Sequence, residues 1–295
     1  MISILLYSLV TIFALFFLGY GLSVIFLPRE LKPYAFWFSP WYTIFFLIFS
    51  LTVFSLAGLP VSYVSFPISI FLVILTIFVL LKGKLPFKLI TKENLFLSLF
   101  VVASVIFNLS PLIRRHKFLT TVSLGNNDVI VYTVVPDYLV NHSLFESFFT
   151  PVSLGVSNLL HDGYRWGPPL LSAFFQHILK LQGYQFVYLF QVILFALTIP
   201  LIYIFLRILY KPTLFGLIVS LVITAFNVNL LYLLYHDFFG QVLFWGLELF
   251  LLLFIYVYFN SDKSKTRHIN LYDVNIGIAL AVLFFSYHEG TLFVL

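Results

Sequence analysis

Long apolar runs alternate with short polar segments along most of this chain. About 20 apolar residues are enough to cross the hydrocarbon core of a bilayer as one helix. The pattern therefore predicts about eight transmembrane helices, at residues 2–27, 41–58, 64–81, 94–112, 184–207, 213–235, 238–259 and 273–295. The fold class that we expect is an all-α integral membrane protein.

A long polar loop interrupts the alternation and divides the chain into three parts. Four spans fill residues 1–112, the loop with short interfacial helices fills 113–183, and four further spans fill 184–295. A bilayer tolerates charge poorly, so we expect a protein this apolar to use the Asp, Asn, His, Gly and Arg residues of its loop.

Both ends of the chain are apolar. The first run, at 2–27, is too long for the core of a signal peptide and lacks a basic leader, which predicts a first span that is retained. The last run ends at Leu295 without a polar tail. We therefore expect this chain to be the N-terminal fragment of a longer protein.

Basic residues predict the orientation in the membrane. The loops on one side carry Arg29, Lys32, Lys82, Lys84, Lys88, Lys92, Arg207, Lys211, Lys263, Lys265 and Arg267, whereas the other basic residues all lie in the long loop. Cytoplasmic loops are enriched in Lys and Arg. This places the N-terminus and the long loop on the extracytoplasmic side, in a plasma or inner membrane.

Composition narrows the possible functions. Apolar residues make up 62% of the chain, compared with about half in a typical soluble domain, and mean hydropathy is +1.07. The absence of Cys excludes disulfides, thiolate metal sites and Cys nucleophiles. The formal charge of +5 comes from short clusters between apolar runs, which predicts contact with membrane lipids and no nucleic-acid partner.

The long loop contains two predicted helices. The run 125–128 predicts a turn that leads into a helix, with Asp128 in the first turn, where the helix dipole favours a carboxylate. Tyr132 shares the Asp128 face, whereas Asp137 points to the opposite face. The second helix is predicted over 170–181, opened by two prolines and lying in the outer interface.

These features resemble the membrane-embedded glycosyltransferases of the GT-C superfamily. The similar features are an acidic residue at the tip of the first large outer loop, a Tyr four residues later, a helix that ends in Asn-His-Ser at 141–143, and the Tyr-Arg-Trp-Gly-Pro-Pro segment at 164–169. The resemblance covers residues 125–207, and the remaining spans only in layout. Many members have a paired acidic motif and place this loop after the first span, unlike this chain.

The resemblance implies that Asp128 is catalytic and that a sugar moves from a polyprenyl-phosphate carrier to an acceptor at the outer face. Glycosyl transfer needs a base for the acceptor hydroxyl and a group that stabilises the leaving phosphate. Asp128 is the candidate base. Arg165, or the cluster 114–117, is the candidate phosphate ligand. Nucleotide sugars are absent outside the cytoplasm, so the expected partner is a lipid-linked sugar donor.

Further polar residues lie near predicted span ends or within spans. His236 and Asp237 form an outer turn, Glu248 lies within the seventh span, and His288 with Glu289 interrupts the last apolar run. Glu248 is equally compatible with an interhelical hydrogen bond and with a functional role. The residues predicted to contact substrate are Tyr132, Arg165, His236, Asp237, His288 and Glu289. Asp128 and Asp237 are the candidate ligands of a divalent cation, the one cofactor that the sequence suggests.

Three other functions fit the same layout. A polysaccharide polymerase or ligase would use the same lipid carrier. A secondary transporter also suits charged residues within spans, although the chain shows no internal repeat and no matched pair of interrupted spans. A non-catalytic scaffold would tolerate Asp128→Ala.

Overall fold

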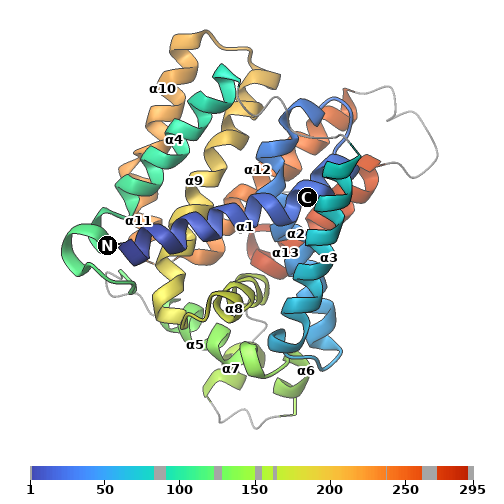
Figure 1. The fold of residues 1–295 in the computed structure, drawn as a ribbon, viewed down its shortest axis with the longest axis vertical. Coiled ribbons are helices and arrows are strands. Elements are labelled where there is room, and N and C mark those ends of the chain that lie inside the picture. The colour runs from blue at the N-terminus through green and yellow to red at the C-terminus, as the bar shows by residue number, and fades with distance from the viewer. Residues whose placement is uncertain are drawn as a thin grey trace.

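The computed structural model describes residues 2–82, 91–122, 128–149, 155–161, 165–236, 238–260 and 271–291, and the described chain is helical without any strand (Figure 1). The α-helices are α1 (Ile2–Phe26), α2 (Ala35–Leu56), α3 (Val61–Leu81), α4 (Lys92–Asn108), α5 (Asp128–Asn141), α6 (Leu144–Ser147), α7 (Gly155–His161), α8 (Gly167–Leu179), α9 (Gly183–Leu209), α10 (Leu214–Ala225), α11 (Val228–Tyr235), α12 (Phe239–Phe259) and α13 (Leu271–Thr291). A 3-10 turn at Lys32–Tyr34 and a π-helical turn at Leu112–His116 complete the described elements.

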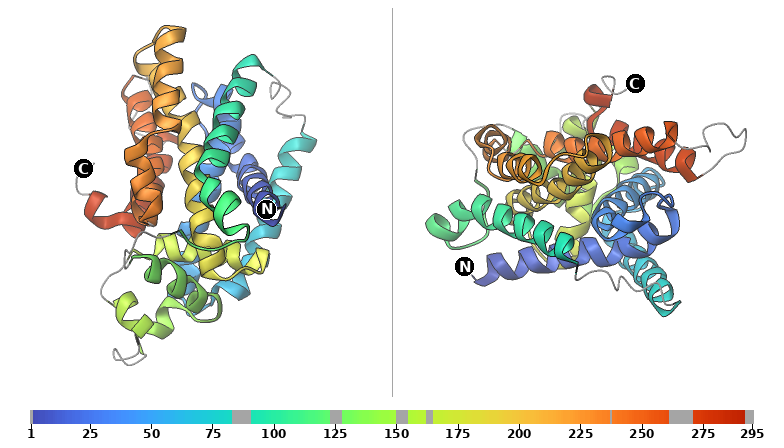
Figure 2. Two further views of the ribbon diagram at one scale, coloured as in Figure 1. Left: turned by 90° about the vertical axis from the view of Figure 1, so that its left-hand side faces the viewer. Right: turned by 90° about the horizontal axis from the view of Figure 1, so that it is seen from above.

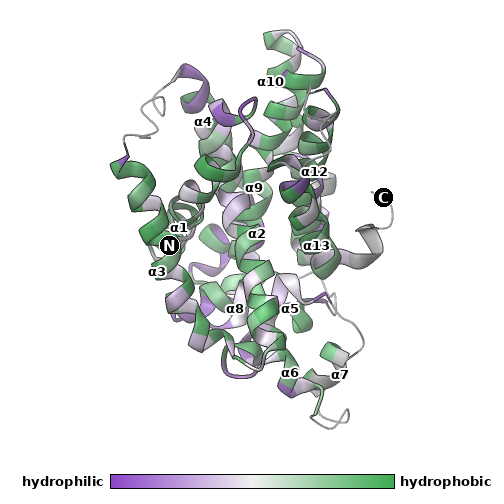
Figure 3. Cartoon of the chain, turned by 90° about the vertical axis from the view of Figure 1, so that its right-hand side faces the viewer, coloured by the Kyte–Doolittle hydropathy of each residue, from purple (hydrophilic) through white to green (hydrophobic). Residues whose placement is uncertain are grey.

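Five of the described helices are long and apolar enough to cross a membrane. They are α1, α2 with the preceding 3-10 turn, α3, α9 and α12. Figure 3 shows hydrophobic residues along most of the long helices and hydrophilic residues near helix ends. Large apolar side chains are exposed on these helices, as expected of surfaces that face lipid. The chain is thus an all-α protein with the helices of an integral membrane protein.

Three of the eight predicted spans differ from a continuous long helix. The segment 213–235 is divided into α10 and α11, because Phe226 leaves the helical conformation with φ −124° and ψ 23°. Helix α13 contains a kink at Tyr287, where φ is −162° and ψ is 75°. Helix α4 has only 17 residues. All eight apolar runs correspond to helices, but not all of these are long enough to cross the membrane alone.

Basic segments adjoin one end of the molecule, and the short helices of the long loop form the other end. The ends of α3, α4, α9 and α10 that flank the basic segments lie in the upper half of Figure 1, and α5, α6, α7 and α8 lie in the lower half. Helix α9 runs between them and is buried along most of its length. Helix α1 runs across the long axis of the molecule, as both Figure 1 and Figure 2 show.

Helix α8 is packed among other helices of the protein. Every residue from Gly167 to Gln176 is buried, and α8 contacts α2, α3, α5 and α9. Two of its polar side chains are buried with it, and Gln176 Nε2 donates to Ser172 Oγ at 2.8 Å. The helix is therefore enclosed by the protein, and its depth in the membrane stays a prediction.

Candidate functional site

The hydroxyl of Tyr132 joins three segments at the lower end of the molecule. Tyr132 on α5 is fully buried, and its oxygen accepts a hydrogen bond from the backbone N–H of Gly240, at 3.2 Å. Arg165 Nη1 donates to the same oxygen at 3.4 Å. The ring packs edge-on against Phe239, at 5.4 Å between centroids. Tyr132 therefore fixes Arg165 beside the first turn of α12.

Gly240 makes this contact possible. A Cβ atom there would lie 2.8 Å from the Tyr132 oxygen, 3.2 Å from Arg165 Cδ and 3.3 Å from Arg165 Nη1. Only a residue without a side chain allows the phenol and the guanidinium to reach the start of α12 together. The unpaired N–H groups of a helix start carry partial positive charge, so the helix and Arg165 together favour an anion.

The kink in α13 places Tyr287 against Arg165. The guanidinium carbon of Arg165 lies 4.0 Å from the centre of the Tyr287 ring. Ser286 lies next to the start of α8, where a Cβ on Gly167 would be 2.6 Å from Ser286 Oγ. Arg165 is thus held by α5, α12 and α13. We name Tyr132, Arg165, Gly240 and Tyr287 the Arg165 cluster.

Asp128 lies one helical turn from Tyr132 on the same side of α5. It is the first residue of α5 and is partly buried, and Tyr132, Val135 and Leu139 of that side are buried. Side chains four residues apart on a helix are neighbours, about 5–6 Å apart at Cβ. The helix and the face that Asp128 shares with Tyr132 are as predicted, whereas the predicted turn at 125–127 lies outside the described residues. The catalytic role of Asp128 stays a prediction.

Asp137 has a structural role on the opposite side of α5. Its Oδ1 accepts a hydrogen bond from the N–H of Gly183, at 2.8 Å, and so caps the start of α9. Partial burial raises the pKa of this carboxyl above its ordinary value, and the hydrogen bond from Gly183 lowers it by a smaller amount. Asp137 and Asp128 therefore do not form one acid–base pair.

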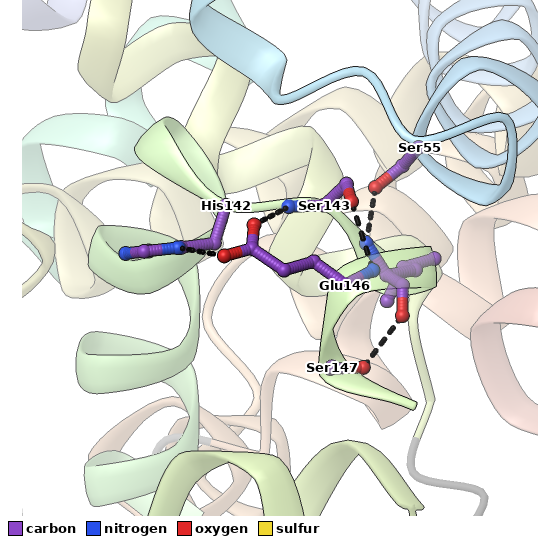
Figure 4. Close-up of polar contacts among 6 residues, drawn as sticks. Ser55, His142, Ser143, Glu146 and Ser147 are labelled. Carbon is purple, nitrogen blue, oxygen red and sulfur yellow. Dashed lines mark hydrogen bonds and ion pairs between the residues drawn. The ribbon is translucent and has the colours of Figure 1, made fainter. Parts of the chain in front are cut away.

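The Asn-His-Ser segment forms a helix cap. Ser143 and Glu146 form a capping box at the start of α6, and Glu146 Oε1 lies 3.0 Å from His142 Nδ1 (Figure 4). The N–H of Leu144 donates to Ser55 Oγ at 2.8 Å, which fastens α6 to the end of α2. These polar residues hold the loop together.

The other predicted site residues are placed only in part. His236 directly follows α11, and the centre of its ring lies 4.0 Å from that of Tyr232. It precedes Gly240 of the Arg165 cluster by four residues in the sequence. His288 and Glu289 follow the Tyr287 kink, but their side chains lie outside the described residues, as does all of Asp237. The basic cluster at 114–117 forms an exposed turn, which suits contact with lipid headgroups.

No group of three or more His, Cys, Asp or Glu side chains that could hold a metal is found in the part of the chain that the structure describes. Asp237, one of the two candidate ligands, is outside that part. Two apolar cavities, of about 360 and 460 Å³, lie between the membrane helices, and neither is lined by the Arg165 cluster.

Comparisons with protein-family models, with curated proteins and with solved structures gave no match to this chain.

Sequence reasoning identified Tyr132 and Arg165 but missed Gly240 and Tyr287. A Gly at the start of an apolar run, immediately after Phe238 and Phe239, was the available signal for a close approach. The contact of Tyr287 with Arg165 depends on the α13 kink, for which the sequence contains neither Pro nor a repeated Gly nearby.

Proposed function

We propose that this protein is a membrane glycosyltransferase that moves a sugar from a lipid-phosphate carrier to an acceptor at the extracytoplasmic face. The observation that supports this most directly is the Arg165 cluster, one helical turn along α5 from Asp128. A carboxylate that accepts a proton and a cation that stabilises the phosphate are the two groups that such a transfer requires.

Each group has a defined task in the proposed reaction. Asp128 accepts the proton of the acceptor hydroxyl as its oxygen forms a bond to the anomeric carbon of the sugar. The bond from that carbon to the phosphate oxygen breaks, and its electron pair stays with the lipid phosphate. Arg165 stabilises the phosphate through its fork of N–H donors, because a guanidinium matches a phosphate in planar, bidentate geometry.

The surroundings of Arg165 support this assignment. The side chain is partly buried, stacked on Tyr287 and bonded to Tyr132, so little side-chain freedom is lost when an anion binds. The start of α12 adds positive potential. By contrast, Arg114 and Arg115 are exposed and carry no comparable support.

The test supplies membranes containing the protein with radiolabelled polyprenyl-phosphate sugars and measures label moved to lipid or protein acceptors. We expect transfer by the wild type and its loss in Asp128→Asn and Arg165→Gln at equal abundance. Asp137→Asn is the matched control, since an amide oxygen can still accept the Gly183 hydrogen bond. Full activity of Asp128→Asn would make Asp128 a helix-start residue and reject it as the base.

A polysaccharide polymerase or ligase would use the same carrier and the same cluster. The size of the labelled product separates the two reactions. A single added sugar supports the transferase, whereas a ladder or a transferred preformed glycan supports the polymerase or ligase.

One observation favours a secondary transporter as a second candidate. Helix α13 is interrupted at Tyr287, and α10 and α11 interrupt another apolar segment, as in transporters whose broken helices bind substrate. Proteoliposomes that contain the protein and labelled lipid-phosphate sugar would distinguish the two. Movement of unreacted label across the bilayer, without covalent transfer, supports transport.

A further inference from the structure

A carboxylate near the middle of a membrane-spanning helix has no partner among the residues that the structure describes. Glu248 is nine residues after the start of α12 and eleven before its end. At helical rise this is about 14 Å from the start. Glu248 makes no hydrogen bond or ion pair with any residue that the structure describes. The described residues therefore do not form the interhelical hydrogen bond to Glu248 that the sequence also allowed.

The side chain lies on the outward side of α12. Gln241, Trp245, Glu248 and Leu252 are partly exposed, whereas Leu247, Phe250 and Leu251 are buried against the rest of the protein. Helices α12 and α13 follow one outer side of the molecule in the view from above (Figure 2, right). Glu248 is at the centre of this outward stripe, which would meet the bilayer interior.

Charged residues at this depth are rare and usually partnered, because lipid chains offer neither water nor hydrogen bonds. We propose that the outward stripe of α12, centred on Glu248, binds a transmembrane helix of a different polypeptide that carries a Lys or Arg in its central turns. The proposal is independent of the glycosyltransferase assignment.

Other occupants fit less well. A two-fold contact with a second copy would bring identical surfaces together and place one Glu248 near the other. A second copy has no suitable cation in another orientation either, because no Lys or Arg lies in the central turns of any predicted span. Lipid amines remain in the headgroup region, roughly 15 Å from the middle of a hydrocarbon core about 30 Å thick.

The test uses synthetic apolar transmembrane peptides that differ at one central position, Lys or Leu. The chain has no Cys, so Phe259→Cys, at the exposed end of α12, provides a unique site for a fluorophore. Energy transfer from a labelled peptide in bicelles then measures association. We expect at least tenfold tighter association for the Lys peptide than for the Leu peptide, and loss of that preference in Glu248→Gln.

Leu252→Ala is the matched control on the same stripe and should keep the preference for Lys. Equal binding of the two peptides would overturn the proposal, and so would a Lys preference that survives in Glu248→Gln. A third result would also overturn the proposal. If energy transfer occurs between two labelled copies of the chain and Glu248→Gln abolishes it, the occupant is a second copy. Glycosyl transfer that continues in Glu248→Gln leaves the proposed function intact whichever result is obtained.

Discussion

The guanidinium of Arg165 stacks on the ring of Tyr287, with 4.0 Å between the guanidinium carbon and the ring centre. A cation over an aromatic face gains about 0.5–2 kcal/mol, depending on exposure to water. Tyr287 reaches this position only because α13 leaves helical geometry there. The kink therefore holds the cation of the site in place.

Replacing the ring of Tyr287 should weaken the proposed transfer. We expect Tyr287→Leu to lower kcat/KM for the lipid-phosphate donor about tenfold, because 1.4 kcal/mol of lost stacking corresponds to that factor. Tyr287→Phe keeps the aromatic face and should retain most of the activity. Steady-state transfer assays on the two variants measure the difference. Equal loss in Phe and Leu variants would assign the role to the hydroxyl instead of the ring.

A methyl group on Gly240 should disrupt the site. In Gly240→Ala the new Cβ would lie 2.8 Å from the Tyr132 oxygen and 3.2 Å from Arg165 Cδ, so both side chains must move. We expect more than tenfold loss of transfer and a destabilisation of about 1–3 kcal/mol, typical of overpacking.

Gly277→Ala is the control for Gly240, because no atom lies within 4 Å of the added Cβ. Ala is favoured over Gly inside a helix by about 1 kcal/mol, so this variant should be fully active and slightly more stable. Thermal unfolding in detergent gives the stability of both variants. A Gly240→Ala protein with wild-type activity would show that Arg165 is not positioned through this contact.

The sequence predicted local features of the fold better than long-range ones. The start of α5 at Asp128 and the face shared with Tyr132 follow from turn residues and helical period, which are local properties. Burial of α8 follows from its neighbours, since α2, α3, α5 and α9 surround it, and a sequence pattern does not contain that information. The pairing of Arg165 with Gly240, 75 residues apart, is likewise a consequence of packing.

Asp137 should give the protein a measurable pH dependence. Partial burial raises the pKa of this carboxyl in the folded state. The folded state therefore binds the proton more tightly than the unfolded state, and this contribution is present at low pH and lost as pH rises through the raised pKa. The wild type should gain stability relative to Asp137→Asn as pH falls from neutral towards the carboxyl range.

Asp137→Ala tests the hydrogen bond separately from the charge. It removes the acceptor of the Gly183 N–H and should destabilise the protein by about 1 kcal/mol relative to Asp137→Asn at all pH values, because neither variant titrates at this position. Unfolding temperatures of the three proteins, measured in detergent at neutral and acidic pH, separate the two effects. A pH-independent difference between wild type and Asp137→Asn would contradict a raised pKa.

The hydroxyl of Thr76 connects α3 to the backbone of α1. It accepts from the N–H of Gly21, at 3.1 Å, and donates to the carbonyl of Phe17, at 2.9 Å. These two backbone groups, four residues apart, are the pair that an undisturbed α-helix joins directly. Thr76 is fully buried, and its hydroxyl bridges two groups that are helical hydrogen-bonding partners.

Thr76→Val should destabilise the protein only modestly, by about 1 kcal/mol. The variant keeps the shape and loses both hydrogen bonds to the hydroxyl, but the Phe17 carbonyl and the Gly21 N–H are helical partners of each other, so neither group is left unpaired in the membrane. Thr76→Ser keeps the hydroxyl and should be close to the wild type. Unfolding in a mixed-micelle titration measures both variants. A loss of several kcal/mol in Thr76→Val would mean that α1 cannot close its own hydrogen bond, and that Thr76 is required to hold α1 across the bundle.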